Sequence, residues 1–166
     1  AQITELCDLN SHPRTKALLE FLYATGLRLG EALGLNMEKL DFAARRILVK
    51  GKGNKERVVF FGIPCTQALT HYLTGRASGP LFLNGAGYRL VSAQAETIIR
   101  RAGEWVGILD LHPHELRAAF ATHLLENGAR EDDVMRLLGH SDLSTTMRYL
   151  VITDQALTQI LEKATP

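Results

Sequence analysis

The chain has 166 residues, of which 46% are hydrophobic and 22% are charged, and its formal net charge at pH 7 is +1. This composition is typical of a globular protein with one sizeable core, and no apolar run approaches the length of a membrane span. Cys7 and Cys65 are far apart and lack a metal-type spacing, which favours a cytoplasmic protein with free thiols. The small net charge neither indicates nor excludes DNA binding, because such a protein needs basic residues on one face rather than a large total.

Hydrophobic periodicity and turn residues predict a mainly α-helical protein with a small antiparallel β-sheet, an α+β fold. In chain order, the expected helices are Ile3 to Cys7, Thr15 to Thr25, Leu27 to Leu35, Thr66 to Leu73, Ala93 to about Val106 behind a Ser92 cap, Pro113 to Asn127, Glu131 to Leu138, a helix carrying Tyr149, and Asp154 to Ala164. The expected strands are Ile47 to Val49 and Val58 to Phe60. Residues expected in the core include Ile98, Ile99, Trp105, Leu116, Phe120 and Leu124.

The second long helix is expected to begin directly after Gly26, and Arg28 and Glu31 stand one turn apart near its start. An ordinary i, i+3 ion pair on a solvated face accounts for this spacing. The apolar residues around the pair also suit a buried arginine that Glu31 holds in place.

A basic turn joins the two expected strands, with the sequence Lys50-Gly51-Lys52-Gly53-Asn54-Lys55. Glycine and asparagine supply the backbone conformations that a tight turn needs. Taken alone, this segment is typical of a solvated hairpin tip.

The stretch from Leu111 to Tyr149 concentrates groups that suit phosphate chemistry. His114 and Arg117 lie in the first turn of a helix that begins at Pro113, where amide groups and the helix dipole favour an anion. His140 follows a glycine that ends the next helix, and Tyr149 carries a possible oxygen nucleophile. A zinc site is disfavoured, since a proline separates His112 from His114 and no HExxH is present.

Four motifs then identify a family. HPHELRAAFATHLLENG and LLGHSDLSTTMRY resemble the signature of the tyrosine recombinases, the phage-type integrase and Xer family, and ATGLRLGEALGL and KGKGNKERVVFF are similar to its other two motifs. The resemblance runs from about Leu18 to Val151. It implies the tyrosine recombinase catalytic-domain fold and a catalytic set of Arg28, Lys52, His114, Arg117, His140 and Tyr149. It also implies support from Glu31 and phosphate contacts by Lys50, Lys55 and Arg57.

The resemblance implies a site-specific recombinase that acts on double-stranded DNA. Tyr149 would attack a phosphodiester to give a 3′-phosphotyrosyl link, with no metal, ATP or other cofactor, and strand exchange would pass through a Holliday junction. A homotetramer on two DNA sites is implied, with the helix after Tyr149 exchanged between protomers. We expect residues 1–166 to be a single catalytic domain, without the family's N-terminal domain that clamps DNA.

Two features depart from the commonest family pattern, and two other functions stay open. Ala118 stands where a second histidine is frequent, and Gly30 stands where serine is common. Neither position belongs to the catalytic set, so the departures affect the subfamily rather than the reaction. The alternatives are a type IB topoisomerase-like nicking or hairpin-resolving enzyme, and a non-catalytic DNA-binding module whose tyrosine is structural.

Overall fold

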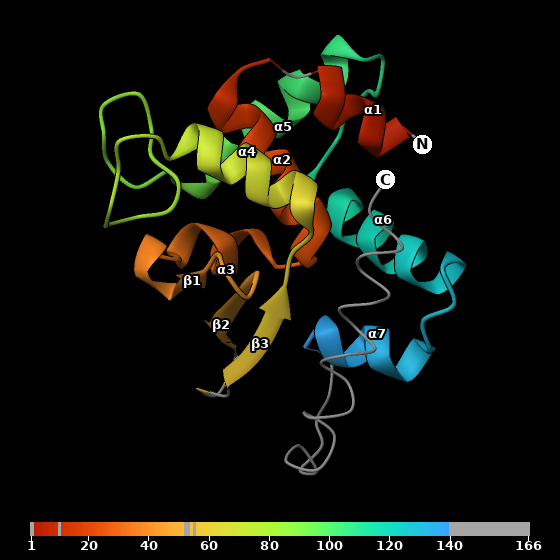
Figure 1. Ribbon diagram of the computed structural model, residues 1–166. Coiled ribbons are helices and arrows are strands. Elements are labelled where there is room, and N and C mark those ends of the chain that lie inside the picture. The colour runs from red at the N-terminus through yellow and green to blue at the C-terminus, as the bar shows by residue number, and fades with distance from the viewer. Residues whose placement is uncertain (1, 10, 52–53, 55, 140–166) are drawn as a thin grey trace.

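The computed structural model describes residues 2–9, 11–51, 54 and 56–139 (Figure 1). Its elements are α1 (Gln2–Leu9), α2 (Pro13–Thr25), α3 (Leu29–Gly34), the 3₁₀ turn η1 (Met37–Lys39), β1 (Leu40–Asp41), β2 (Arg46–Lys50), β3 (Glu56–Phe60), α4 (Ile63–Tyr72), α5 (Ser92–Trp105), α6 (Pro113–Glu126) and α7 (Glu131–Leu137). The expected α+β class is confirmed. Within the described residues, no helix is long and apolar enough to cross a membrane.

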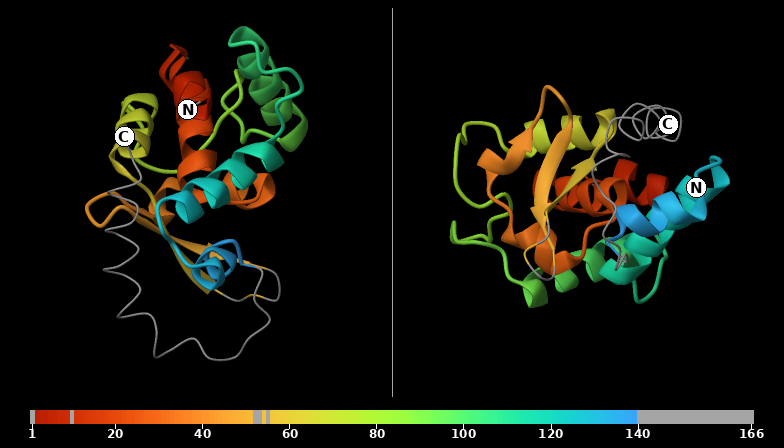
Figure 2. Two further views of the ribbon diagram at one scale, coloured as in Figure 1. Left: turned by 90° about the vertical axis from the view of Figure 1, so that its right-hand side faces the viewer. Right: turned by 90° about the horizontal axis from the view of Figure 1, so that it is seen from below.

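Helix α2 is the centre of the fold. It packs against α1, α4, α5, α6 and strand β3, and its buried residues lie all round the helix instead of on one stripe. Pro13 suits its first turn because proline lacks the N–H that would have no partner there. Gly26 ends the helix in the left-handed region, with φ +60°. Both views in Figure 2 show α6 next to α2 and α7 next to α6.

The sheet has three antiparallel strands in the order β1-β2-β3. Ile47 and Val49 of β2 are buried while their neighbours are exposed, so one face of the strand points to the helices. In the register of β2 with β3, Leu48 pairs with Val58 and Lys50 with Glu56. The pair of Lys50 with Glu56 lies at the end of the two strands that is farther from α2 and α4 (Figure 1).

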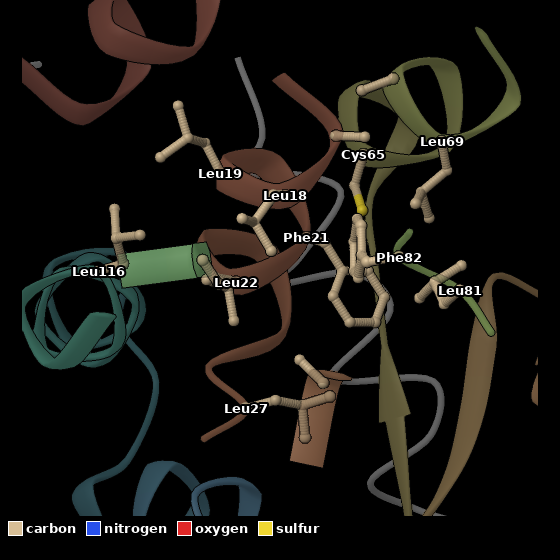
Figure 3. Packing of buried hydrophobic residues seen from close by; sticks show 14 of the residues in the cluster. Leu18, Leu19, Phe21, Leu22, Leu27, Cys65, Leu69, Leu81, Phe82 and Leu116 are labelled. Atoms are coloured by element: carbon tan, nitrogen blue, oxygen red, sulfur yellow. The ribbon is translucent and has the colours of Figure 1, made fainter. Parts of the chain in front are cut away.

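The main core lies between α2, α4, the sheet and the 80–90 segment. Figure 3 shows Phe21 of α2 beside Phe82 and near Leu81, and the Phe21 and Phe82 rings meet edge to face at 5.6 Å between centroids. A second, smaller cluster joins α6 to α7 and contains Phe120, Leu124, Ala129, Val134, Leu137 and Leu138. The expected burial of Leu116, Phe120 and Leu124 is confirmed.

Two expectations about α5 are wrong. Trp105 is 84% exposed, because the buried stripe of this helix is formed by Ala95, Ile99, Ala102 and Gly103, and Trp105 lies off it at the last residue. Ser92 is the first helical residue and not the cap, since Val91 occupies the N-cap position with an extended backbone. Ile99 is buried as expected, and Ile98 is partly buried against the core.

Candidate active site

The residues expected in the site come from separate parts of the chain. Arg28 and Glu31 stand at the start of α3, Arg57 lies on β3, and His114 and Arg117 lie in the first turns of α6. Four others lie outside the described residues: Lys52, Lys55, His140 and Tyr149.

Glu31 holds the backbone at the start of α3. The Arg28 amide donates to Glu31 Oε2 at 2.9 Å, and Arg28 Nη1 lies 3.7 Å from Glu31 Oε1. The pairing of Arg28 with Glu31 is therefore present, but the expectation of a buried arginine is wrong, because the Arg28 side chain is 50% exposed. Arg28 occupies the N-cap position with an extended backbone, ahead of the helical turn, while the neighbouring Leu27 takes the buried position. The Arg28 guanidinium thus keeps one side open to solvent.

Arg57 binds the same carboxylate from the neighbouring sheet. Arg57 Nη1 donates to Glu31 Oε1 at 3.0 Å and Nη2 donates to Oε2 at 2.9 Å, a bidentate pair. Burial alone would raise the pKa of the Glu31 carboxyl. The hydrogen bonds from Arg57 and the Arg28 amide, with the charges of both arginines, outweigh burial and hold the pKa below its usual 4.5. Glu31 is therefore ionised at neutral pH.

Arg117 is buried and bonds to two main-chain carbonyls. Its Nη2 donates to the Leu138 oxygen at 2.6 Å, and its Nη1 donates to the Gly26 oxygen. Burial lowers the pKa of Arg117, the Arg28 charge lowers it further, Glu31 raises it, and Arg57 lowers it again. The guanidinium stays charged, since an arginine is not deprotonated in a protein at ordinary pH. Through these bonds Arg117 connects α6 to the α2–α3 turn and to the end of α7.

His114 lies near Arg117 in sequence but in a different environment. It is exposed on the first turn of α6, whereas Arg117, one turn on, is buried. The turn is fixed by Pro113 and by Glu115, whose Oε2 accepts the His112 amide at 2.6 Å. The helix start thus presents an imidazole to solvent beside a buried guanidinium.

On the basic turn, the structure describes Lys50, Gly51 and Asn54. Lys50 is exposed, and its Nζ lies 3.9 Å from Glu56 Oε1. Asn54 has φ +60°, in agreement with the turn chemistry expected of asparagine.

The described site is a cluster of three guanidinium groups around one carboxylate. Each of Arg28, Arg57 and Glu31 acts electrostatically on Arg117, so the four groups share one region with two positive charges in excess. Guanidinium groups bind phosphate oxygens in a bidentate manner, so such a cluster suits a phosphate anion.

Sequence reasoning missed the contacts that cross between elements. Nothing local in the sequence pairs Arg57 with Glu31, which is 26 positions away, or Arg117 with the Gly26 carbonyl, which is 91 positions away. Gly26 and Gly139, which the sequence marks only as helix ends, stand next to these arginines in the structure.

Comparison with known proteins agrees with the four motifs. Residues 1–156 match the phage integrase family. The chain is 42% identical over 163 residues to the tyrosine recombinase XerD of Mycobacterium tuberculosis, covering 92% of this chain and 52% of that protein. It is 39% identical over 168 residues to the tyrosine recombinase XerC of Bifidobacterium longum, covering 92% of this chain and 47% of that protein.

Solved structures resemble the whole described fold. The XerA recombinase gives a TM-score of 0.78 at 29% identity, over 99% of this chain and 62% of that one. The integrase from mycobacterium phage Brujita gives 0.82 at 26% identity, over 99% of this chain and 56% of that one. The chain spans about half the length of its Xer relatives. It belongs to the phage integrase family of tyrosine recombinases and has their catalytic-domain fold.

Proposed function

We propose that this chain is the catalytic domain of a site-specific recombinase that cuts and rejoins double-stranded DNA. The observation that carries the proposal is the cluster of Arg28, Arg57 and Arg117 around Glu31, which brings three of the four family motifs into one positively charged region. A relative supports DNA as the substrate: the XerH recombinase, 26% identical over 95% of this chain, is described in a post-cleavage complex with a palindromic difH substrate. A cytoplasmic location agrees with such a substrate.

The proposed reaction exchanges one phosphate ester for another. The Tyr149 oxygen attacks the phosphorus, the bond to the 5′-oxygen breaks, and a 3′-phosphotyrosyl ester and a 5′-hydroxyl remain. Arg28 and Arg117 stabilise the charge on the non-bridging oxygens, and His140 donates a hydrogen bond to one of them. His114 accepts the tyrosine proton, and Lys52 donates a proton to the leaving oxygen. A 5′-hydroxyl from another strand then reverses the reaction, so the ester conserves bond energy and no ATP is consumed.

A nicked suicide substrate tests this function directly. Cleavage next to the nick releases a short strand that diffuses away, so the covalent complex accumulates and can be counted on a denaturing gel. We expect an adduct with the parent chain and none with Tyr149→Phe, which keeps the ring and loses the nucleophile. An adduct with Tyr149→Phe would refute the assignment of the nucleophile. Failure of the parent chain to form any adduct would favour a non-catalytic DNA-binding module.

Strand exchange separates a recombinase from a nicking enzyme that shares the tyrosine chemistry. Joining of strands from two DNA sites through a Holliday junction supports recombination, whereas relaxation or hairpin resolution alone supports the topoisomerase-like alternative.

We further propose a homotetramer on two sites, in which the segment Asp154 to Pro166 packs on the next protomer. Leu157, Ile160 and Leu161 make a narrow apolar stripe in its sequence. A helix this short needs a partner surface to be stable. Removal of the segment should spare folding and weak DNA binding and reduce assembly, as measured by analytical ultracentrifugation with site DNA. A large loss of monomer stability with unchanged assembly would show docking within the same protomer.

A further inference from the structure

We propose that Arg57 is a positioning residue that fixes Glu31 and the end of α7, and that it does not contact the DNA backbone. This inference rests on the proposed cleavage reaction and adds a residue to its machinery. It replaces the phosphate contact that the family resemblance implies for this arginine.

The first observation is the geometry of the pair with Glu31. Both terminal nitrogens of Arg57 donate to the two carboxylate oxygens, at 3.0 and 2.9 Å, and the side chains are only 17% and 13% exposed. The same carboxylate accepts the Arg28 amide at 2.9 Å. Arg57 therefore acts through Glu31 on the backbone from which the Arg28 guanidinium extends.

The second observation is a contact with the end of α7. A Cβ placed on Gly139 would lie 3.3 Å from both Cζ and Nη1 of Arg57, so the guanidinium packs against this glycine. Gly139 has φ +71°, a conformation that glycine adopts without strain. The next residue in the chain is His140. From β3, Arg57 therefore contacts both Glu31 at the start of α3 and Gly139, which directly precedes His140.

The third observation is that the charge of this guanidinium is already neutralised. A phosphate would have to displace a negatively charged carboxylate from Nη1 and Nη2, whereas the Gly26 and Leu138 carbonyls that accept from Arg117 are neutral and leave its charge in place. Arg57 Nε is buried without a hydrogen-bond partner in the part of the chain that the structure describes. Lys50, on the neighbouring strand, has a side chain that is 61% exposed, which suits a backbone contact better. The two basic residues of the same hairpin thus have different roles.

The test compares Arg57→Met and Arg57→Lys with a control arginine on the same sheet. Arg46→Met is matched, because Arg46 also pairs with a carboxylate, Asp41 at 3.4 Å, but at an exposed position far from the turn. Single-turnover cleavage is measured at saturating DNA, and DNA affinity is measured across a salt series. Circular dichroism establishes that each variant is folded, and Arg57→Lys retains the charge should Arg57→Met fail to fold.

We expect cleavage by Arg57→Met to fall by about 10- to 100-fold, the scale of a small misplacement in an active site. Arg57→Lys should recover little of this, because one ammonium cannot reproduce a bidentate pair. The salt dependence of binding should be the same as for the parent chain, and Arg46→Met should cleave normally. A salt slope reduced by about one in Arg57→Met would show a lost phosphate contact and overturn the proposal.

A double variant tests whether Arg57 acts through Glu31. Arg57→Met/Glu31→Gln should cleave no more slowly than Glu31→Gln alone, whereas losses that multiply would mean that Arg57 acts independently and would overturn the proposal. A carbon NMR titration gives a readout that does not need cleavage: Arg57→Met should raise the pKa of Glu31, and an unchanged pKa would also overturn it. If the parent chain forms no adduct, the proposed function fails. If it cleaves and Arg57→Met cleaves equally fast, only this inference fails.

Discussion

Replacement of Gly26 by alanine should both destabilise the protein and disturb Arg117. Gly26 has φ +60°, and a Cβ there would lie 2.3 Å from Cδ1 and 2.6 Å from Cε1 of Phe120. Phe120 is 5% exposed and belongs to the α6–α7 cluster, so its ring has little free space to move into. The Gly26 carbonyl accepts a hydrogen bond from Arg117, so any backbone shift that relieves the overlap also moves a partner of that guanidinium.

The expected cost has two parts. An L-residue other than glycine in the left-handed region costs about 1–2 kcal/mol. Forcing an extra methyl group into a packed core costs about 1–3 kcal/mol more. The total of about 2–5 kcal/mol is a large share of the roughly 5–15 kcal/mol that stabilises a typical domain.

Urea unfolding of matched variants separates the two parts. Gly75→Ala is the control, because Gly75 has φ +80° but open space where its Cβ would lie. It should lose only the backbone part, about 1–2 kcal/mol. Adding Phe120→Leu to Gly26→Ala should restore part of the loss, a positive coupling in a double-mutant cycle. Equal losses for Gly26→Ala and Gly75→Ala would refute the overlap with Phe120.

Three further outcomes are expected. Folding lowers the pKa of Glu31, so the ionised carboxylate contributes its full stabilisation above the pKa of the unfolded chain, near 4.5. This contribution is lost as the pH falls through the pKa of the folded chain. In acid-unfolding curves, Glu31→Gln should therefore lose less stability below pH 4.5 than the parent chain does. Arg117→Lys should slow suicide-substrate cleavage by roughly 10²-fold, because one ammonium cannot replace a guanidinium that also holds the Gly26 and Leu138 carbonyls, and a normal rate would refute the role proposed for Arg117 in cleavage. Lys52→Ala should slow cleavage of an ordinary phosphodiester but not of a 5′-bridging phosphorothioate, whose sulfur leaves without a proton; equal losses would make Lys52 an electrostatic contact.

The helices were largely predictable because their ends carry local signals. Gly26 marks the end of α2 and Pro113 marks the start of α6, as the sequence indicated, whereas α2 begins at Pro13, two residues before the expected Thr15. The strands were expected one or two residues short, because the charged ends Arg46, Lys50 and Glu56 of β2 and β3 do not resemble strand residues. Strand β1 was missed because two residues show no periodicity.

The site was predictable in its residues and not in its connections. Arg28 and Glu31 are one turn apart, so their pairing follows from helix geometry. The partners of Arg57 and Arg117 are set by how β3, α6 and α7 pack on α2, and such packing depends on many side chains at once. The wrong expectation for Trp105 has the same origin, since an aromatic residue at a helix end is buried only if another element covers it.

The two arginine contacts at the end of α7 show why this helix is part of the site. Helix α7 buries its apolar residues against α6 in a cluster that is separate from the main core. Its end is joined to the rest of the molecule by Arg117, through the Leu138 carbonyl, and by Arg57, through its packing on Gly139. Both arginines belong to the positive cluster, and the pKa of Arg117 is lowered first by burial and then by repulsion from the charges of Arg28 and Arg57. We expect a phosphate bound at the cluster to offset that repulsion. Such binding would then strengthen the contacts that hold the end of α7 at Leu138 and Gly139.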